Sequence, residues 1–460
     1  MTNVDLIIIG AGPGGYETAV KAAENGLKTV IVEQAKVGGT CLNQGCIPTK
    51  CFCKNAELIS EVKEAEEMGL ESLTYSAFNM KKAVERKNQV VETLVSGIEA
   101  LLKNPNIIRV QGRAQFVDAK TVKVENATNV AGEAIDTEYQ ANNIIIATGS
   151  VTKFLPIPGK DLPKVYTSTE MLDIDFVPKR LCVIGGGVIG MEFASIFNAF
   201  GSEVTVLEYC KEILPNFDSD ISKRLKASLK GKGINIINNA AVNGIQDLGS
   251  EYKVTYMLKD KEEGVEADIV LMAVGRAANL DSLNLAEVGI ETDRRGIVTD
   301  NDFRTNVPSI YAIGDINGKC QLAHAATFQG YHALNVIMGV EDKIRFDIIP
   351  AAVFTNPEAA TVGISADYCK ANGIEAKAHK SFFRANGKAL AMNESDGMVK
   401  IIEGADGTIL GCHLFGAHAA DLIQEIAALM NKGATISDLQ QIIHAHPTLG
   451  EVVMNAANAK

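Results

Sequence analysis

The chain has 460 residues, of which 47% are hydrophobic and 22% charged, a balance typical of a soluble globular protein with enough apolar material for about three domains. Its 44 Lys and Arg residues are outnumbered by 56 Asp and Glu residues, and a net charge of −12 argues against nucleic-acid binding through bulk charge. No apolar run is long enough for a membrane span, the first residues lack a signal-peptide profile, and nine cysteines do not suggest a secreted disulfide framework. We therefore expect a cytoplasmic protein with neither a membrane nor a nucleic-acid partner.

The N-terminal region carries the first informative pattern. A buried strand over residues 6–9 runs into Gly10-x-Gly12-x-x-Gly15, an Ala-rich helix and a second strand that ends at Glu33. Gly10 permits a tight turn, Gly12 lets the backbone approach a pyrophosphate, and Gly15 lets the helix pack closely on the strand. The helix N-terminus attracts phosphate, and Glu33 is placed to accept hydrogen bonds from a ribose. The pattern predicts a dinucleotide-binding βαβ unit.

The same pattern recurs further along the chain. Every landmark returns after 175 residues, so that the pairs are Gly10 and Gly185, Gly12 and Gly187, Gly15 and Gly190, Glu17 and Glu192, and Glu33 and Glu208. Two coincidental glycine turns would not produce five equal offsets, so a second dinucleotide unit is predicted. An acidic residue at 208 favours NAD, because the 2′-phosphate of NADP would face a carboxylate there.

The rest of the chain suggests further elements around these two units. Residues 51–103 have helical spacing, 107–140 read as short strands, and buried strands are predicted at 143–149 and 268–275. A Pro-rich stretch at 155–163 suggests a linker. Beyond residue 346 the glycine fingerprints stop, and strands at 397–415 followed by a helix at 418–432 suggest a separate α+β domain. The expected fold class is α/β, with two Rossmann-like units and a C-terminal domain.

A cluster of cysteines follows Glu33 closely. Cys41 and Cys46 lie five residues apart at the start of a predicted helix, a spacing that can close a small disulfide ring. Pro48 suits the first turn of that helix, and a helix N-terminus lowers a thiol pKa. With Cys51 and Cys53, four cysteines lie within thirteen residues, so zinc is the alternative. The spacing lacks the C-x2-C pairs of structural zinc sites, and Cys51 and Cys53 are predicted to be helix-packing residues.

Three segments together resemble a known family over nearly the whole chain. GGTCLNQGCIPTK, residues 38–50, resembles the redox-active disulfide segment of the FAD-dependent pyridine nucleotide–disulfide oxidoreductases. Residues 305–315 resemble the second FAD motif of that family, and residues 323–326 resemble the helix whose N-terminal N–H groups face the flavin ring. The resemblance implies an FAD-binding domain over 1–150 with the redox disulfide, an NAD-binding domain over 151–276, a return segment over 277–345 that completes the FAD domain, and an interface domain for dimerisation over 346–460.

The resemblance also implies roles for individual residues. Cys41 and Cys46 would form the redox disulfide, with Cys41 attacked by substrate and Cys46 against the flavin, while Lys50 and Glu192 would form an ion pair near flavin N5. The implied FAD contacts are Gly10, Gly12, Gly15, Glu33, Gly39, Thr40, Lys50, Ala114, Thr148, Gly149, Asp315 and Ala323, and the implied NAD contacts are Gly185, Gly187, Gly190, Glu208 and Gly275. No metal is expected.

The C-terminal segment indicates the branch of the family. His446 and Glu451, five apart across a Pro turn, are typical of a base and the carboxylate that orients it, with His444 as the alternative base. This segment resembles the His–Pro–Thr…Glu dyad of members that oxidise a protein-bound dihydrolipoyl group with NAD, with Gly450 where Ser is common. The resemblance implies a homodimer whose partner is a lipoyl-bearing protein of a 2-oxoacid dehydrogenase or glycine cleavage complex.

Other branches of the family, and a flavoprotein subunit without turnover, fit the sequence less well. Glu208 argues against the NADPH-dependent glutathione reductases, and the position of the last cysteine, Cys412, argues against mercuric reductases, which carry a C-terminal cysteine pair. A flavoprotein subunit without turnover would need neither the cysteine pair nor the His446–Glu451 pair. A dihydrolipoyl-oxidising enzyme is therefore the leading prediction.

Overall fold

The computed structural model describes residues 1–459, and the chain divides into two compact units. The first unit comprises residues 1–49, 85–153 and 275–344, and the second comprises residues 50–84, 154–274 and the chain from residue 345 onward. Two helices, α3 (Cys46–Glu64) and α4 (Met80–Leu101), contain a boundary between units. No helix in residues 1–459 combines the length and apolar character that crossing a membrane requires.

A six-stranded sheet lies at the centre of the first unit. Strand β1 (Thr2–Ile9) pairs in parallel with β2 and β5, β2 with β3, and β5 with β16, whereas β4 is antiparallel to β3 and β5. Leu6, Ile7 and Ile8 have no exposed surface, as expected for a parallel strand covered on both faces. The other elements are β2 (Thr29–Glu33), α2 (Gly39–Gln44), β3 (Ile107–Phe116), β4 (Thr121–Thr128), β5 (Glu138–Ile146), β6 (Ser150–Thr152), β15 (Arg276–Ala278) and β16 (Ile310–Ala312), with short 3-10 helices at Leu285–Val288 and Gly314–Asn317.

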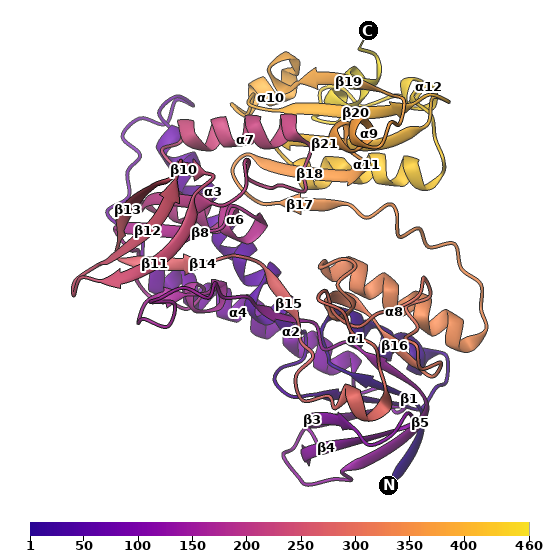
Figure 1. Cartoon of the computed structure of the whole chain (residues 1–460). Coiled ribbons are helices and arrows are strands. Elements are labelled where there is room, and N and C mark those ends of the chain that lie inside the picture. The colour runs from indigo at the N-terminus through magenta and orange to yellow at the C-terminus, as the bar shows by residue number, and fades with distance from the viewer. Residues whose placement is uncertain (460) are drawn as a thin grey trace. The chain divides into compact units, whose positions relative to one another are not determined.

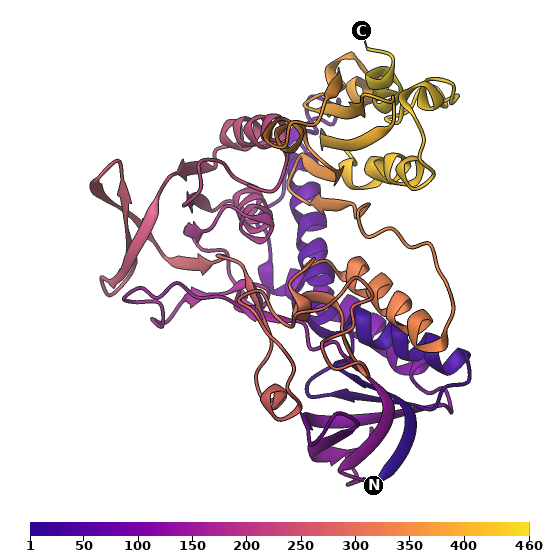
Figure 2. The ribbon, with the colours of Figure 1, turned by 45° about the vertical axis from the view of Figure 1, so that its right-hand side comes forward.

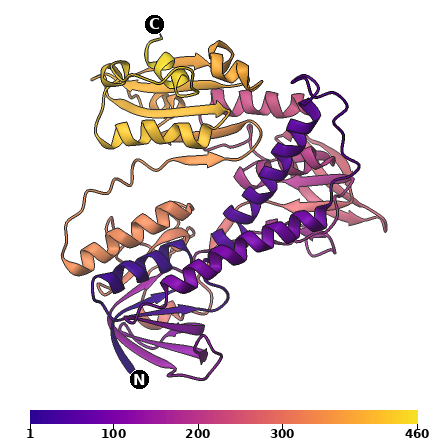
Figure 3. The ribbon, with the colours of Figure 1, turned by 180° about the vertical axis from the view of Figure 1, so that it is seen from behind.

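Two helices of this unit, α1 (Pro13–Glu24) and α8 (Ala323–Met338), lie side by side (Figures 1 and 3). The two helices approach closely at Gly330. A Cβ at this position would lie 1.9 Å from Thr18 Oγ1 and 3.0 Å from the carbonyl oxygen of Gly14. Glycine at position 330 therefore sets the spacing between the two helices.

The second unit contains a parallel sheet with the strand order β10-β9-β8-β14-β7. Helix α6 (Val188–Phe200) is apolar on nearly every face, as expected of a helix enclosed in a core. The ring of Phe197 contacts those of Phe193 and Phe200, and the ring of Phe200 also contacts those of Phe52 and Phe78. The strands and other helices are β7 (Val165–Tyr166), α5 (Ser168–Met171), β8 (Arg180–Ile184), β9 (Glu203–Glu208), α7 (Ser219–Gly231), β10 (Asn235–Asn238) and β14 (Ile269–Met272), with an antiparallel sheet of β11 (Ala241–Asp247), β12 (Tyr252–Leu258) and β13 (Lys261–Ala267), seen in Figure 2.

The C-terminal part of the second unit is an antiparallel sheet with the order β17-β18-β21-β20-β19. Helix α11 (Ala419–Asn431) packs on β18 and β21 through Ile423 and Ile426, both buried (Figure 2). The elements are β17 (Ala351–Val353), β18 (Glu358–Gly363), α9 (Ala366–Ala371), β19 (Ala376–Phe382), α10 (Gly387–Ala391), β20 (Met398–Gly404), β21 (Ile409–Gly416), α12 (Ile436–Gln440) and α13 (Glu451–Ala457), with a 3-10 helix at Phe383–Ala385.

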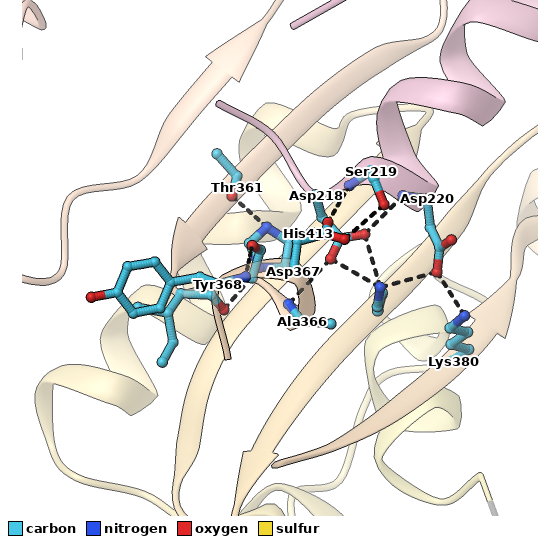
Figure 4. A network of polar contacts seen from close by, with 12 residues as sticks. Asp218, Ser219, Asp220, Thr361, Ala366, Asp367, Tyr368, Lys380 and His413 are labelled. Atoms are coloured by element: carbon cyan, nitrogen blue, oxygen red, sulfur yellow. Dashed lines mark hydrogen bonds and ion pairs between the residues drawn. The ribbon is translucent and has the colours of Figure 1, made fainter. Parts of the chain in front are cut away.

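A buried ionic network joins this sheet to helix α7 (Figure 4). Asp218, the N-cap of α7, has no exposed surface, and both of its carboxylate oxygens lie 2.9 Å from Lys400 Nζ on β20. Lys400 also donates to Asp220 at 3.0 Å, and Lys380 reaches the same carboxylate at 2.8 Å. The hydrogen bonds to the two aspartates outweigh the effect of burial and raise the pKa of Lys400, so the network holds a charged lysine.

The elements predicted from hydrophobic patterning are confirmed: the strands at 6–9, 29–33 and 181–184, the helices within 51–103 and the C-terminal helix near 418–432. One detail differs. The cysteine pair was expected at the start of one helix, but Cys41 lies inside α2 and only Cys46 begins α3, with Gly45 between the two helices. A Cβ at Gly45 would lie 3.0 Å from the carbonyl oxygen of Thr40, so the small residue permits the close junction that splits the helix.

Candidate functional site

The first glycine turn has the steric features that a dinucleotide site needs. Gly10 has φ +105°, and a Cβ there would lie 2.4 Å from the carbonyl oxygen of Ala147. A Cβ at Gly15 would lie 1.9 Å from the carbonyl oxygen of Gly10, so α1 begins against the turn itself. Gly12 is the N-cap and provides no side-chain cap, which leaves the first N–H groups of α1 directed toward the space that a phosphate would take.

Glu33 fastens this turn at the end of β2. Its carboxylate oxygens accept hydrogen bonds from the N–H of Ala11 and the N–H of Ala35, each at 2.8 Å. The Glu33 carboxylate, which was predicted to bind a ribose, therefore also fixes the glycine turn through Ala11.

Asp315 lies in a polar cluster that the sequence did not predict. Ser150 Oγ donates to Asp315 Oδ2 at 2.5 Å, and Arg276 Nε donates to Ser150 Oγ at 2.7 Å. Burial raises the pKa of the Asp315 carboxyl, although Ser150 and Arg276 oppose the shift. Burial lowers the pKa of the Arg276 guanidinium, although the nearby Asp315 carboxylate opposes the shift. Asp315 thus presents a partly buried carboxylate that suits hydroxyl donors such as those of a flavin side chain.

The predicted redox cysteines both belong to the first unit. Cys41 is partly buried in α2, Cys46 is exposed at the first residue of α3, and Pro48 lies in the first turn of α3. The pairing of Cys41 with Cys46 stays a prediction.

The second glycine turn repeats the first. Gly185 has φ +110°, and a Cβ there would lie 2.4 Å from the carbonyl oxygen of Ala273. A Cβ at Gly190 would lie 2.0 Å from the carbonyl oxygen of Gly185, and the N-cap Gly187 again has no side-chain cap. Glu208 accepts from the N–H of Gly186 and of Cys210, both at 2.5 Å.

Lys50 and Glu192 come together in the second unit. Lys50 Nζ lies 3.0 Å from Glu192 Oε1 and 3.1 Å from Oε2. The side chain of Glu192 is 5% exposed and that of Lys50 is 32% exposed. This ion pair, 142 residues apart in sequence, therefore has one buried and one partly accessible end.

The C-terminal histidines differ in exposure. His446 Nδ1 lies 2.9 Å from Glu451 Oε1, and its side chain is 79% exposed. The N–H of Thr448 donates to Glu451 Oε2, and this bond followed by the contact with His446 lowers the pKa of Glu451. His444 Nε2 lies 2.8 Å from Glu425, and its side chain is 8% exposed. In residues 1–459 the Nε2 atom of His446 has no hydrogen-bond partner, which leaves it accessible to a substrate.

The remaining predicted contacts all lie in the first unit, including Gly275, which was assigned to NAD. In the first unit, Thr148 Oγ1 donates to the carbonyl oxygen of Asn279 at 3.0 Å, which ties the return segment to the end of β5. The other residues lie as follows: Gly39 and Thr40 in α2, Ala114 in β3, Gly149 after β5, Ala323 at the first residue of α8, and Gly275 directly before β15.

Among residues 1–459 there is no group of three or more His, Cys, Asp or Glu side chains that is arranged for a metal. Cys51 is buried, and Cys53 packs beside the phenylalanine core. By contrast, two glycine turns, two helix N-termini without side-chain caps and the partly buried carboxylate of Asp315 fit two dinucleotides. These features define the class: an oxidoreductase with two dinucleotide sites.

Comparisons with known proteins identify the family. Residues 4–330 match the family model described as pyridine nucleotide-disulphide oxidoreductase, and residues 349–457 match the dimerisation domain of the same family. The chain belongs to the pyridine nucleotide-disulphide oxidoreductase family.

Similar proteins narrow the class. The chain is 41% identical over 455 residues to a dihydrolipoyl dehydrogenase of Geobacillus stearothermophilus, covering 98% of this chain and 95% of the relative. It is 42% identical over 458 residues to a dihydrolipoyl dehydrogenase of Bacillus subtilis, again covering 98% and 95%. Among solved structures, LpdA from Mycobacterium tuberculosis has a TM-score of 0.89 at 28% identity, covering 100% and 99% of the two chains. A Cu(II) complex of the flavoprotein disulfide reductase RclA from Escherichia coli has a TM-score of 0.87 at 29% identity, with the same coverage.

Several predictions from the sequence are thereby confirmed. The α/β fold, the family, its FAD and NAD cofactors and the resemblance to dihydrolipoyl dehydrogenases agree with these matches. Sequence reasoning missed Ser150 and Phe354, which donate hydrogen bonds to predicted site residues, and Arg276, which donates to Ser150. Only the position of Arg276 directly after Gly275 offered a signal.

Proposed function

We propose that the protein is a dihydrolipoyl dehydrogenase, which oxidises a protein-bound dihydrolipoyl group and passes the electrons to NAD. The observation that carries the proposal is the pair of His446 and Glu451, in which a carboxylate holds one ring nitrogen and leaves the other accessible. Relatives named dihydrolipoyl dehydrogenase at 41% and 42% identity over 98% of the chain support it.

In the proposed reaction His446 acts as the base. Its Nε2 takes a proton from one thiol of the dihydrolipoyl group, and Glu451 stabilises the resulting imidazolium through Nδ1. The thiolate attacks Cys41 Sγ of a Cys41–Cys46 disulfide, so that a mixed disulfide forms and Cys46 leaves as a thiolate. The second substrate thiol, once deprotonated, displaces Cys41, and the products are the cyclic lipoyl disulfide and a Cys41, Cys46 dithiol.

The remaining residues prepare the two cofactor sites. FAD, when bound in the first unit, would supply the two-electron chemistry that connects the dithiol with NAD. Lys50, held by Glu192, places a positive charge where negative charge develops on reduction. Glu208 selects NAD through the ribose hydroxyls.

The first test is an assay of the FAD-loaded protein with dihydrolipoamide and NAD, followed as NADH formation. His446→Gln is expected to lower kcat by about 10²–10⁴-fold, the usual contribution of a general base. His418→Asn is the matched control, because His418 is an exposed histidine of the same domain with φ +54°, which asparagine tolerates. Full activity of His446→Gln, with loss in His444→Gln, would assign the base to His444 instead.

We further propose that the active site is composite, with His446 of one chain serving the cysteine pair of a partner in a symmetric homodimer. The match of residues 349–457 to a dimerisation domain supports this arrangement. The hybrid dimer isolated from a mixture of Cys41→Ser and His446→Gln chains is expected to show about half the wild-type activity, since one of its two sites keeps both functional groups. A hybrid without activity would show that each chain builds its own site.

The partner is proposed to be a lipoyl-bearing protein of a 2-oxoacid dehydrogenase or glycine cleavage complex. The expected outcome of a pull-down from the native cell is a protein that carries lipoyl-lysine. Turnover of free dihydrolipoamide without any lipoyl protein in the pull-down would contradict this assignment.

A further inference from the structure

The Lys50–Glu192 ion pair has a third participant that lies far away in sequence. Phe354, directly after β17, donates its N–H to Glu192 Oε1 at 3.0 Å. The Phe354 ring centroid lies 4.3 Å from Lys50 Nζ, within the range of a cation–π contact. One residue therefore contacts both members of the ion pair, the carboxylate through its backbone and the ammonium through its ring.

Besides the hydrogen bond from the Phe354 N–H to Glu192, two further contacts hold the backbone around Phe354. The thiol of Cys53 donates to the carbonyl oxygen of Phe354 at 3.4 Å, from one helical turn after Lys50 on α3. The N–H of Asn356 donates to Ser195 Oγ at 3.1 Å, and Ser195 lies one turn after Glu192 on α6. Burial, followed by the charge of Glu192, raises the pKa of Cys53 to about 12, so its thiol stays protonated and remains a donor.

These contacts explain how Glu192 is satisfied although it is 4% exposed. Its carboxylate receives two hydrogen bonds from Lys50 and one from Phe354. A buried carboxylate needs such partners because an incompletely satisfied charge is costly away from water. Lys50, in contrast, is partly exposed, and its long flexible stem leaves the ammonium several available positions.

We propose that Phe354 is a positioning residue that fixes the ammonium of Lys50 by holding Glu192 through its N–H and Lys50 through its ring face. Cys53, which the sequence suggested was only a packing residue, orients Phe354 through its carbonyl oxygen. The inference rests on the proposed function in one respect, the placement of Lys50 beside the flavin. Loss of the ring then lets the ammonium move, and a cation that stabilises reduced flavin less makes the flavin harder to reduce.

The test compares Phe354→Leu and Phe354→Tyr in the FAD-loaded protein. In Phe354→Leu the flavin midpoint potential is expected to become more negative and kcat to fall about threefold to tenfold with KM for NAD unchanged, in line with the usual strength of a cation–π contact. Phe354→Tyr, which keeps a ring face, is expected to restore both values. Phe354→Met, with similar apolar volume and no ring, replaces Phe354→Leu if that variant does not fold.

Phe382→Leu is the matched control, because its ring is contacted by Arg224 and Arg384 instead of Lys50 and packs beside the same phenylalanine core. It is expected to leave the midpoint potential at the wild-type value. A potential in Phe354→Leu or Phe354→Met equal to that of Phe354→Tyr would overturn the inference even with full dihydrolipoamide turnover. Because the potential is measured without a lipoyl substrate, failure of the proposed function would leave this result readable.

Discussion

The two glycine turns of this chain are nearly the same structure placed in two different surroundings. A Cβ at the first glycine would lie 2.4 Å from a facing carbonyl oxygen in both turns, and a Cβ at the third glycine would lie 1.9 Å or 2.0 Å from the carbonyl oxygen of the first. In both turns a glutamate at the end of the second strand accepts two backbone N–H groups.

The residues one turn further along the helices have diverged. Glu17 on α1 accepts a hydrogen bond from the Tyr331 hydroxyl at 3.1 Å, whereas its equivalent Glu192 on α6 is buried and binds Lys50. The comparison shows that backbone sterics fix the conformation of the turn, whereas a side chain one turn further along the helix can make different contacts in the two units. An ion pair can therefore form on the helix that follows such a turn without disturbing the turn itself.

The largest expected effect comes from adding one methyl group to each turn. Gly10→Ala places a Cβ against Ala147 at a φ that favours glycine, and the purified protein is expected to lack FAD. Gly185→Ala is expected to retain FAD but to bind NADH about tenfold to hundredfold more weakly, from a strain of about 1–3 kcal/mol. Flavin absorbance and NADH titration measure the two outcomes.

Gly97→Ala is the control for both variants, because nothing lies within 4 Å of a Cβ built at this helical position. It is expected to bind both nucleotides normally. If Gly10→Ala carried a full complement of FAD, the two turns would not be equivalent in their demand for glycine.

The second unit contains the buried ionic network around Asp218, and removing Lys400 tests how much the stability of that unit depends on the network. Lys400→Met leaves the fully buried Asp218 without its cation and is expected to lower the free energy of unfolding by about 3–5 kcal/mol. Lys380→Met, whose side chain is 41% exposed, is expected to cost less than about 1 kcal/mol. Urea unfolding measures the free energy of unfolding of both variants. Equal losses would show that Lys400 is not the main cation of the buried ionic network.

A smaller effect is expected from exchanging the glutamate that fastens the second turn. Glu208→Arg is expected to weaken NAD and favour NADP, since a hydrogen bond to a charged acceptor is worth about 1.5–3 kcal/mol, roughly tenfold to a hundredfold in affinity. Glu203→Arg, at the exposed start of the same strand, is the matched control and is expected to keep the NAD preference. Unchanged KM values for both nucleotides in Glu208→Arg would remove Glu208 as the discriminator.

The smallest expected effect is a dependence of the second unit on acid. Burial lowers the pKa of His413 below its ordinary 6.5, with its Nδ1 2.5 Å from Thr361 Oγ1 and its Nε2 3.1 Å from the carbonyl oxygen of Ile364. Above pH 6.5 the stability that depends on neutral His413 is fully present. As the pH falls below 6.5 the unfolded chain binds the proton first, and up to about 1.4 kcal/mol is lost for each pH unit until the folded pKa is reached.

The contribution of Asp220 does not overlap with this window. Hydrogen bonds from Lys380 and then Lys400 lower the pKa of Asp220 from 3.8 to about 2, so its stabilisation is lost only between those two values. Melting temperatures between pH 7.5 and 5 are expected to fall in the wild type and less steeply in His413→Gln. Parallel curves would show that His413 does not titrate in this range.

Much of the fold could be predicted from the sequence because its determinants are local. Strand β1 is an apolar run ended by a glycine, and the steric demands of Gly10 and Gly15 are met within one turn of backbone. The constant spacing of 175 residues between the two sets of landmarks then predicted the second dinucleotide unit. The His446–Glu451 pair was equally accessible, since only five residues separate its members.

The rest could not be predicted because the partners meet only through the tertiary fold. Phe354 lies 162 residues from Glu192, and Lys400 lies 182 residues from Asp218. Neither phenylalanine nor lysine at those positions carries a spacing signal. The split between α2 and α3 was missed because it depends on how Gly45 lets one helix begin directly against the end of another.

The close packing of α1 and α8 at Gly330 has a consequence for the N-termini of both helices. The N-terminus of α1 follows the phosphate turn, and the N-terminus of α8 is the segment proposed to meet the flavin ring. Because a Cβ at Gly330 would collide with Thr18 Oγ1 and approach the carbonyl oxygen of Gly14, a larger residue there would push the two helices apart. One added methyl group would therefore change the separation between the phosphate turn and the N-terminus of α8, although it lies about two helical turns from that N-terminus.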